Sequence, residues 1–235
     1  MKKINNLYII IPSFNRIYGG VFMEMRTTKI HSSVNPNAII RVIPGHFVTN
    51  HSHINTYVDM TIMKSRKSEA AAAASVLARK YTTSTYIDTI ICMDGCEVIG
   101  AYLADELTAS GIMSLNQHKT MYIVTPEMNP GGQLIFRDNM QFMIEGKHCL
   151  LLLASATTGR TVARALECIQ YYGGMISGVS AIFSASDKVE GVEINHIFSA
   201  EDIENYQTFE ASKCPMCARG EKIDAIVNSF GYSRL

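Results

Sequence analysis

The chain has 235 residues, 47% of them apolar and 18% charged, and its 21 basic side chains match its 21 acidic ones in number. This length suits one large domain or a domain with an appendage, and the neutral balance argues against nucleic acid as the main partner. No apolar run approaches the roughly 20 residues that a helix needs to cross a bilayer. The basic start lacks the apolar length of a secretory signal because its apolar run ends at Pro12. We therefore expect a cytoplasmic protein that interacts with no membrane, and its six cysteines should be reduced thiols or metal ligands.

Residues 1–60 are predicted to form a β-rich hood. They are rich in β-branched and aromatic residues, and turn signals at Gly19-Gly20, Pro36 and Pro44 divide them into short strands.

Residues 61–206 are predicted to form an α/β core in which strands and helices alternate. The expected strands are fully apolar, and the expected helices have cap residues or apolar faces of helical period. The strands are expected over 86–93, 120–126, 149–154 and 175–184, and the helices over 68–81 (with Ser68 as its cap), 101–110 and 161–174. This alternation is typical of a doubly wound parallel sheet with both faces covered.

Residues 207–235 are predicted to be a short C-terminal tail with one short helix. In doubly wound sheets ligands bind at the carboxyl ends of the strands. The loops that follow Met93 and Leu153 are therefore the expected binding loops.

The loop after Leu153 combines small residues, hydroxyls and a glycine between a strand and an amphipathic helix. Converging backbone N–H groups and the positive end of the helix dipole would make it an anion nest for a phosphate. It lacks the lysine of a Walker-type loop, and an ordinary turn with a threonine cap is the alternative. Arg160 is either part of the nest or a solvated surface residue. The predicted phosphate-binding residues are Ser155, Ala156, Thr157, Thr158, Gly159, Arg160 and Thr161.

Four segments together resemble the type I phosphoribosyltransferase family. Residues 146–179 resemble the segment that binds the 5-phosphate of phosphoribosyl pyrophosphate, and residues 91–107 look like the pyrophosphate loop. Residues 51–81 and 193–206 are similar to the orotate branch of the family. The resemblance implies a homodimer, a phosphorylated ribose compound or nucleotide as ligand, and Mg²⁺ if the protein is catalytically active. It assigns the pyrophosphate loop to Asp94, Gly95, Cys96 and Glu97.

The chain departs from this family where the chemistry is concentrated. Leu153 and Ala154 occupy the two acidic positions that hold the ribose hydroxyls in the family, and Thr125-Pro126 stands where the orotate branch has Arg-Lys. The loop that should carry a catalytic lysine has no basic residue before Arg137. A reaction through a ribosyl cation needs fixed contacts to the ribose and cations beside the departing pyrophosphate.

Two functions therefore stay open, and no catalytic residue is assigned. One is binding of a phosphoribosyl compound with weak or lost transferase activity. The other is an active orotate phosphoribosyltransferase, which makes orotidine monophosphate in pyrimidine biosynthesis. Asp94, Glu97 or Arg160 could serve a modified chemistry, although Glu97 would also suit the helix dipole alone.

The tail contains a possible metal half-site. Cys214 and Cys217 have the two-residue spacing of a zinc knuckle, and the chain has no second Cys-x-x-Cys. Two copies in a dimer could supply four thiolates to one Zn²⁺, whereas a redox role would require the pair to open a helix after a strand. His51 and His53 are expected to share a strand face, either as metal ligands or in a turn or the ligand cleft.

Overall fold

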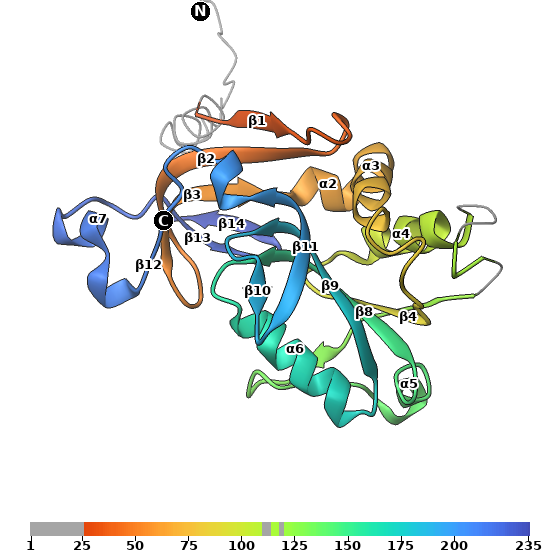
Figure 1. Cartoon of the computed structure of the whole chain (residues 1–235). Helices are drawn as coiled ribbons and strands as arrows, with labels where there is room; N and C mark the ends of the chain where they lie inside the picture. The colour runs from red at the N-terminus through yellow and green to blue at the C-terminus, as the bar shows by residue number, and fades with distance from the viewer. Residues whose placement is uncertain (1–25, 110–113, 118–119) are drawn as a thin grey trace, which may run out of the picture.

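The computed structural model describes residues 26–109, 114–117 and 120–235, and the first 25 residues of the predicted hood and Ser110 lie outside this part. Within it the chain forms a hood sheet and a helix-covered core sheet (Figure 1). A two-stranded hairpin of β6 (Glu127–Met128) and β7 (Leu134–Ile135) stands apart from both sheets.

The core sheet has the strand order β10-β11-β9-β8-β4-β5, and its strands are parallel except for the edge strand β10. The bounds are β4 Thr89–Cys92, β5 Tyr122–Val124, β8 His148–Ala156, β9 Met175–Ser184, β10 Lys188–Val189 and β11 Val192–Ser199. The predicted doubly wound α/β fold is confirmed. All four strands expected in the core are present, and the strand expected over 175–184 has those bounds.

Helices cover both faces of the core sheet, which explains why β8 is apolar along its length. Leu150 and Leu152 pack in one cluster with α3 (Lys67–Ala78) and α4 (Glu97–Ala109). Leu151 and Leu153 point to the other face and pack with α6 (Arg160–Tyr171). Because successive side chains of a strand alternate between the two faces, a strand covered on both sides must be apolar at every position. Two short helices, α2 (Thr61–Ser65) and α5 (Asp138–Gln141), also belong to the core segment.

Two helix starts differ from the sequence-based predictions. The residue before α3 is Arg66, so Ser68 lies inside the helix, and no side chain caps that end. Extended backbone at Arg66 separates α2 from α3 and fixes this start. The helix expected from residue 101 begins at Glu97, since the Asp94–Gly95 turn already reverses the chain.

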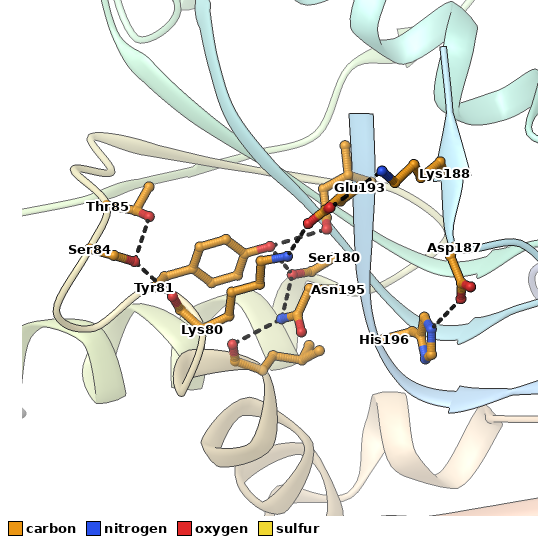
Figure 2. A network of polar contacts seen from close by, with 12 residues as sticks. Lys80, Tyr81, Ser84, Thr85, Ser180, Asp187, Lys188, Glu193, Asn195 and His196 are labelled. Carbon is orange, nitrogen blue, oxygen red and sulfur yellow. Dashed lines mark hydrogen bonds and ion pairs between the residues drawn. The ribbon is translucent and has the colours of Figure 1, made fainter. Parts of the chain in front are cut away.

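A polar network ties the end of α3 to the core sheet (Figure 2). The Tyr81 hydroxyl donates to the carbonyl of Val179 at 3.1 Å and lies 2.8 Å from the Ser180 hydroxyl. Asn195 on β11 donates to the carbonyl of Leu77 at 3.1 Å. Gly178 is required beside this ring, because a Cβ there would lie 2.7 Å from Tyr81 Cε1. The network fixes α3 against β9 and β11.

The hood sheet has the order β12-β3-β2-β13-β14, with β1 paired to β2. The bounds are β1 Thr28–His31, β2 Ile39–Val48, β3 His53–Asp59, β12 Thr208–Phe209, β13 Ala225–Asn228 and β14 Gly231–Arg234. β2 contains a bulge between Pro44 and Phe47. Ala225 and Val227 join Phe47 and Tyr57 in a separate small core under this sheet.

The tail is more than the predicted appendage with one short helix. It carries the short helix α7 (Pro215–Ala218), but β12, β13 and β14 also belong to residues 207–235 and pair with the hood. The 3₁₀ helix η2 (Ala200–Asp202) precedes the tail, and the 3₁₀ helix η3 (Ala211–Lys213) lies within it between β12 and α7. The sequence did not reveal these strands because none exceeds four residues. Hood and tail are thus one sheet built from both ends of the described chain.

Among the described residues, the helices are too short or too polar for any of them to span a membrane.

Candidate functional site

A cavity of about 820 Å³ lies where the hood meets the carboxyl ends of the core strands. The core supplies the loops after β4, β5 and β8, the hood supplies residues from Thr49 to Met60, and α2 supplies Thr61 and Lys64. Another wall is formed by Val227 to Phe230, at the end of β13 and in the turn to β14. The cavity is therefore at the edge of the sheet where the sequence predicted ligand binding.

The predicted phosphate loop forms one wall of this cavity. Thr157 and Thr158 follow β8, and α6 begins at Arg160. Gly159, just before α6, has φ +74°, and no side chain caps that helix. The N–H of Ala163 bonds to the carbonyl of Gly159 at 2.9 Å, so the N–H groups of residues 160–162 precede the helical bonds of α6. The threonine-capped turn is absent, and the first turn of α6 offers backbone donors.

Gly159 is required by space as well as by its dihedral angle. A Cβ at this position would lie 2.7 Å from Cγ2 of Val189 on β10. A left-handed backbone also costs a non-glycine residue about 1–2 kcal/mol. The neighbouring strand therefore holds this loop in shape.

The seven predicted phosphate-binding residues do not all face the cavity. Ser155 and Ala156 are the last residues of β8 and line it, as do Thr157, Thr158, Gly159 and Thr161. Arg160 is exposed and is absent from the cavity wall, whereas Arg164 one turn later lines it. Phosphate binding by these residues stays a prediction.

The two positions that resemble the family's acidic pair are buried in apolar surroundings. Leu153 is fully buried under α6, and Ala154 is buried but reaches the cavity wall. Neither offers a side-chain acceptor to a sugar hydroxyl.

The predicted pyrophosphate loop is a tight turn between β4 and α4. Asp94 and Gly95 both have positive φ, 59° and 75°, and both line the cavity together with Glu97. Glu97 accepts a hydrogen bond from the Thr125 hydroxyl at 2.8 Å. Cys96 points into the core, and burial raises the pKa of its thiol well above the usual value. Three of the four predicted residues thus face the cavity, and Cys96 does not.

The carboxyl group of Asp94 lies beside the position where the family's acids would be. It accepts hydrogen bonds from the backbone of Ala154 and from Ser229. Burial raises the pKa of Asp94, and the nearby Lys64 charge and these hydrogen bonds oppose that rise. The carboxyl group of Asp94, in the loop after β4, thus lies next to Ala154 in β8.

Two cationic side chains of the cavity were not found from the sequence. Lys64, in α2, donates from Nζ to the carbonyl of Asp94 at 2.8 Å and to the carbonyl of Ser229. Arg164 Nη1 lies 3.8 Å from the Cβ position of Gly132 in the β6–β7 hairpin. Arg164 could have been found from its helical spacing to Thr161. Nothing in the sequence pointed to Lys64, because α2 and the loop after β4 come together only in the folded structure.

The excursion that should carry the family's catalytic lysine folds as the β6–β7 hairpin. Met128, Gly132 and Leu134 of this segment line the cavity. Arg137 instead pairs with Glu127 through two hydrogen bonds of 2.8 and 2.7 Å, outside the cavity wall. The lysine that contacts the predicted pyrophosphate loop is instead Lys64 of α2.

The cysteine pair of the tail meets two histidines of the hood. His46, His53, Cys214 and Cys217 place their potential ligand atoms within 4.8 Å of one another. His51 and His53 do not share a strand face, because β3 begins at His53 and His51 lies in the preceding turn. His51 is exposed and lines the cavity instead. The sequence missed His46, which is seven residues before His53 and within the β2 bulge.

We compared the chain with protein-family models, curated protein sequences and solved structures. No protein-family model matches the chain, and no curated protein sequence matches it. Among solved structures, the UMP synthase of Leishmania donovani matches with a TM-score of 0.50 and 12% identity over 68% of this chain. The match spans 34% of that UMP synthase, about a third of its length.

Two orotate phosphoribosyltransferase structures match over more of their own length. That of Mycobacterium tuberculosis H37Rv in complex with inorganic phosphate has a TM-score of 0.45 and 12% identity, over 81% of this chain and 91% of that one. That of Aeropyrum pernix has a TM-score of 0.47 and 16% identity, over 68% and 88%. The parallel core, the two loops and the hood agree with the resemblance that the motifs carry, and the chain has the type I phosphoribosyltransferase fold.

Proposed function

We propose that the cavity binds a phosphoribosyl compound, either phosphoribosyl pyrophosphate or a nucleotide, and that transferase activity is weak or lost. The observation that carries the proposal is the loop of residues 155–161, which opens its glycine turn and the start of α6 into a cavity of about 820 Å³. Backbone N–H groups at a helix start bind phosphate without help from particular side chains. The ligand's 5-phosphate belongs at this wall.

The remaining walls suit a ribose and a base. The aromatic residues Tyr57, Phe183, Tyr206 and Phe230 line the cavity between hood and core. Aromatic faces stack on planar bases. With the phosphate at α6, the ribose would lie over Ala154, and neither Leu153 nor Ala154 has a side chain that accepts its hydroxyls. This lack of contacts is the reason for expecting weak transfer.

An active orotate phosphoribosyltransferase is the second candidate, and one arrangement favours it. Asp94 brings a carboxyl group beside Ala154, and Lys64 brings a cation to the same loop. Together they could replace part of the missing acidic pair and the missing lysine. A cation beside the departing pyrophosphate stabilises the charge that develops in the transition state.

The transferase alternative implies Mg²⁺, which prefers oxygen ligands and keeps several of its waters. The carboxylates of Asp94 and Glu97 line the cavity beside the positive-φ turn, so the donor set fits the ion when a diphosphate supplies further oxygens. Bound there, Mg²⁺ would neutralise charge on the departing group. A homodimer, which the resemblance implies, stays a prediction.

Isothermal titration calorimetry with phosphoribosyl pyrophosphate, orotidine monophosphate and inorganic phosphate tests the binding proposal. Gly159→Asp places a carboxylate in the loop and should abolish binding of all three. Gly191→Asp is the matched control, since Gly191 also has positive φ, at +78°, and no atom lies within 4 Å of its Cβ position. Equal binding by both variants and the unaltered protein would refute the site.

An orotate-consumption assay on the same sample separates the two candidates. Binding without turnover supports a binder with lost transfer. Turnover that disappears in Lys64→Met and Asp94→Asn would instead establish the transferase.

A further inference from the structure

Four side chains from opposite ends of the described chain converge beside the hood. His46 Nε2 lies 3.0 Å from His53 Nδ1, and both sulfurs, of Cys214 and Cys217, lie 3.6 Å from His46 Nε2. Cys217 Sγ is 3.3 Å from His53 Nδ1. His46, His53 and Cys214 are buried, with 3%, 8% and 3% of their surface exposed, and Cys217 is exposed.

Four of the six separations among the ligand atoms are close to those of a tetrahedral metal site, and all six are within 4.8 Å. With Zn–S bonds of about 2.3 Å and Zn–N bonds of about 2.05 Å, tetrahedral angles place nitrogens about 3.3 Å apart and nitrogen and sulfur about 3.6 Å apart. The nitrogen–nitrogen separation of 3.0 Å and the nitrogen–sulfur separations of 3.3 to 3.6 Å lie within about 0.3 Å of that geometry.

The outer contacts of His46 orient it for this role. Its Nδ1 lies 3.1 Å from the carbonyl of Glu221, which can only accept, so Nδ1 carries the hydrogen. The lone pair of Nε2 then faces the cluster. A histidine that binds a metal typically donates its other ring N–H to such an acceptor.

The backbone around His46 is shaped to aim the ring. The β2 bulge between Pro44 and Phe47 takes His46 out of the strand register, and its N–H bonds to Asp224 Oδ2 at 3.0 Å instead. Bulges re-aim a side chain in this way. Gly45 leaves room for Asp224, because a Cβ there would lie 2.4 Å from Asp224 Oδ2. Asp224 is itself paired with Arg26 at 3.2 Å.

We propose that His46, His53, Cys214 and Cys217 bind one structural Zn²⁺ within a single chain. The two thiols release their protons on binding, and the two thiolates neutralise the ion's double charge, which a largely buried site requires. All four positions of the tetrahedron are protein ligands, so the site is closed to substrate. The cysteine spacing alone also allowed a different site, in which two copies of the chain supply four thiolates to one ion. The single-chain site proposed here takes its place.

The ion would fasten the tail to the hood. Cys214 directly precedes α7 and Cys217 lies within it, and β13 follows from Ala225 to pair with β2 beside the His46 bulge. The next turn, Asn228 to Phe230, forms the cavity wall that Lys64 contacts through Ser229. The zinc site therefore stabilises the segment that closes the cavity.

Metal analysis of the full chain, purified in reductant and without a polyhistidine tag, tests the proposal. About one zinc per chain should remain after gel filtration. Half a zinc per chain would place the ion between two copies and overturn the single-chain site. No zinc, together with no uptake of Zn²⁺ in competition with a chelating dye, would overturn the proposal altogether.

Ligand variants and matched controls assign the four residues. Cys217→Ser and His53→Ala should each lose at least 90% of the bound zinc. His51→Ala and Cys168→Ser should each keep one zinc per chain, because neither side chain belongs to the cluster. The Cys168 thiol instead donates a hydrogen bond to the Leu134 carbonyl. Full zinc content in the ligand variants would overturn the assignment.

Cobalt substitution keeps the proposal testable if a ligand variant does not fold. Co²⁺ added to the metal-free, unmutated chain should give the visible bands of a tetrahedral ion and a thiolate charge-transfer band, and one equivalent of Zn²⁺ should remove them. An octahedral Co²⁺ spectrum, without the charge-transfer band, would contradict two-cysteine ligation.

Discussion

The proposed phosphate loop and the four-residue cluster proposed to bind zinc are built in opposite ways. The loop is one continuous stretch, residues 155–161, and its donors are backbone N–H groups held by the turn at Gly159. The cluster joins positions 168 residues apart, from His46 to Cys214, and every ligand is a side chain. The loop should therefore tolerate changes of side chain and fail when its backbone is altered, whereas the cluster should fail when a single ligand is removed.

The largest expected effect is loss of stability when the cluster loses a ligand. Cys214→Ser should lower the free energy of unfolding by more than about 4 kcal/mol, the range associated with loss of a bound metal or a comparable defect. Urea unfolding with and without a chelator measures it. The chelator should destabilise the unmutated protein and leave the variant unaffected.

Cys168→Ser is the control for removing a buried thiol, because serine can keep the hydrogen bond to the Leu134 carbonyl. If both variants lost the same stability, the Cys214 effect would be a packing defect and would not indicate a metal.

The next effect is loss of phosphate affinity when the loop backbone is altered. Gly159→Ala should weaken binding of phosphoribosyl pyrophosphate about 10- to 100-fold, as expected for lost hydrogen bonds to a charged group. Its Cβ would contact Val189 and displace the turn. Calorimetry on the folded variant measures the change.

Gly146→Ala separates this effect from general strain. Gly146 also has positive φ, +65°, but no atom lies within 4 Å of its Cβ position. Gly146→Ala should lose roughly 1–2 kcal/mol of stability, the cost of a left-handed residue, and Gly159→Ala should lose more because its Cβ also meets Val189. Only Gly159→Ala should lose affinity, and a parallel loss in Gly146→Ala would argue against a site at the loop.

The same contrast explains what the sequence could predict. The four core strands and the helices between them follow from local apolar patterns, and the prediction of a phosphate loop, which stays a prediction, rests on adjacent residues such as Thr157 and Gly159. His46 could not be found as a candidate ligand, because its proposed role depends on a bulge and on a cysteine 168 residues away. Lys64 faces the β4 loop only through the packing of hood on core, and β13 and β14 are too short to show a pattern.

A smaller effect is expected from Lys64, the side chain that links the hood to the β4 loop. Lys64→Met should weaken binding of phosphoribosyl pyrophosphate about 10-fold, since hydrogen bonds to charged groups contribute roughly 1.5–3 kcal/mol. Binding of inorganic phosphate, which belongs at the α6 wall, should change less than about twofold, in line with the small effect of a screened, distant charge.

Lys67→Met is the matched control, because Lys67 is an exposed lysine three residues later. Equal losses for both ligands in Lys64→Met would mean that Lys64 supports the cavity as a whole and does not contact the pyrophosphate.

The smallest expected effect is a pH-dependent gain of stability in Asp94→Asn. Burial raises the pKa of Asp94 in the folded protein, so between its unfolded value, about 3.9, and the higher folded value the folded state binds more protons. Stability conferred by the protonated carboxyl is therefore lost as pH rises through this window. Above this pH window the variant should have a slightly higher melting temperature than the unaltered protein, and below the unfolded pKa the two melting temperatures should converge.

Thermal unfolding from pH 3 to 8 measures this difference, with Glu97→Gln as the control for removing one negative charge from the same loop. A variant that is less stable at neutral pH would mean that the attraction to Lys64 and the hydrogen bonds from Ala154 and Ser229 outweigh burial, and that the charged carboxylate holds the loop together.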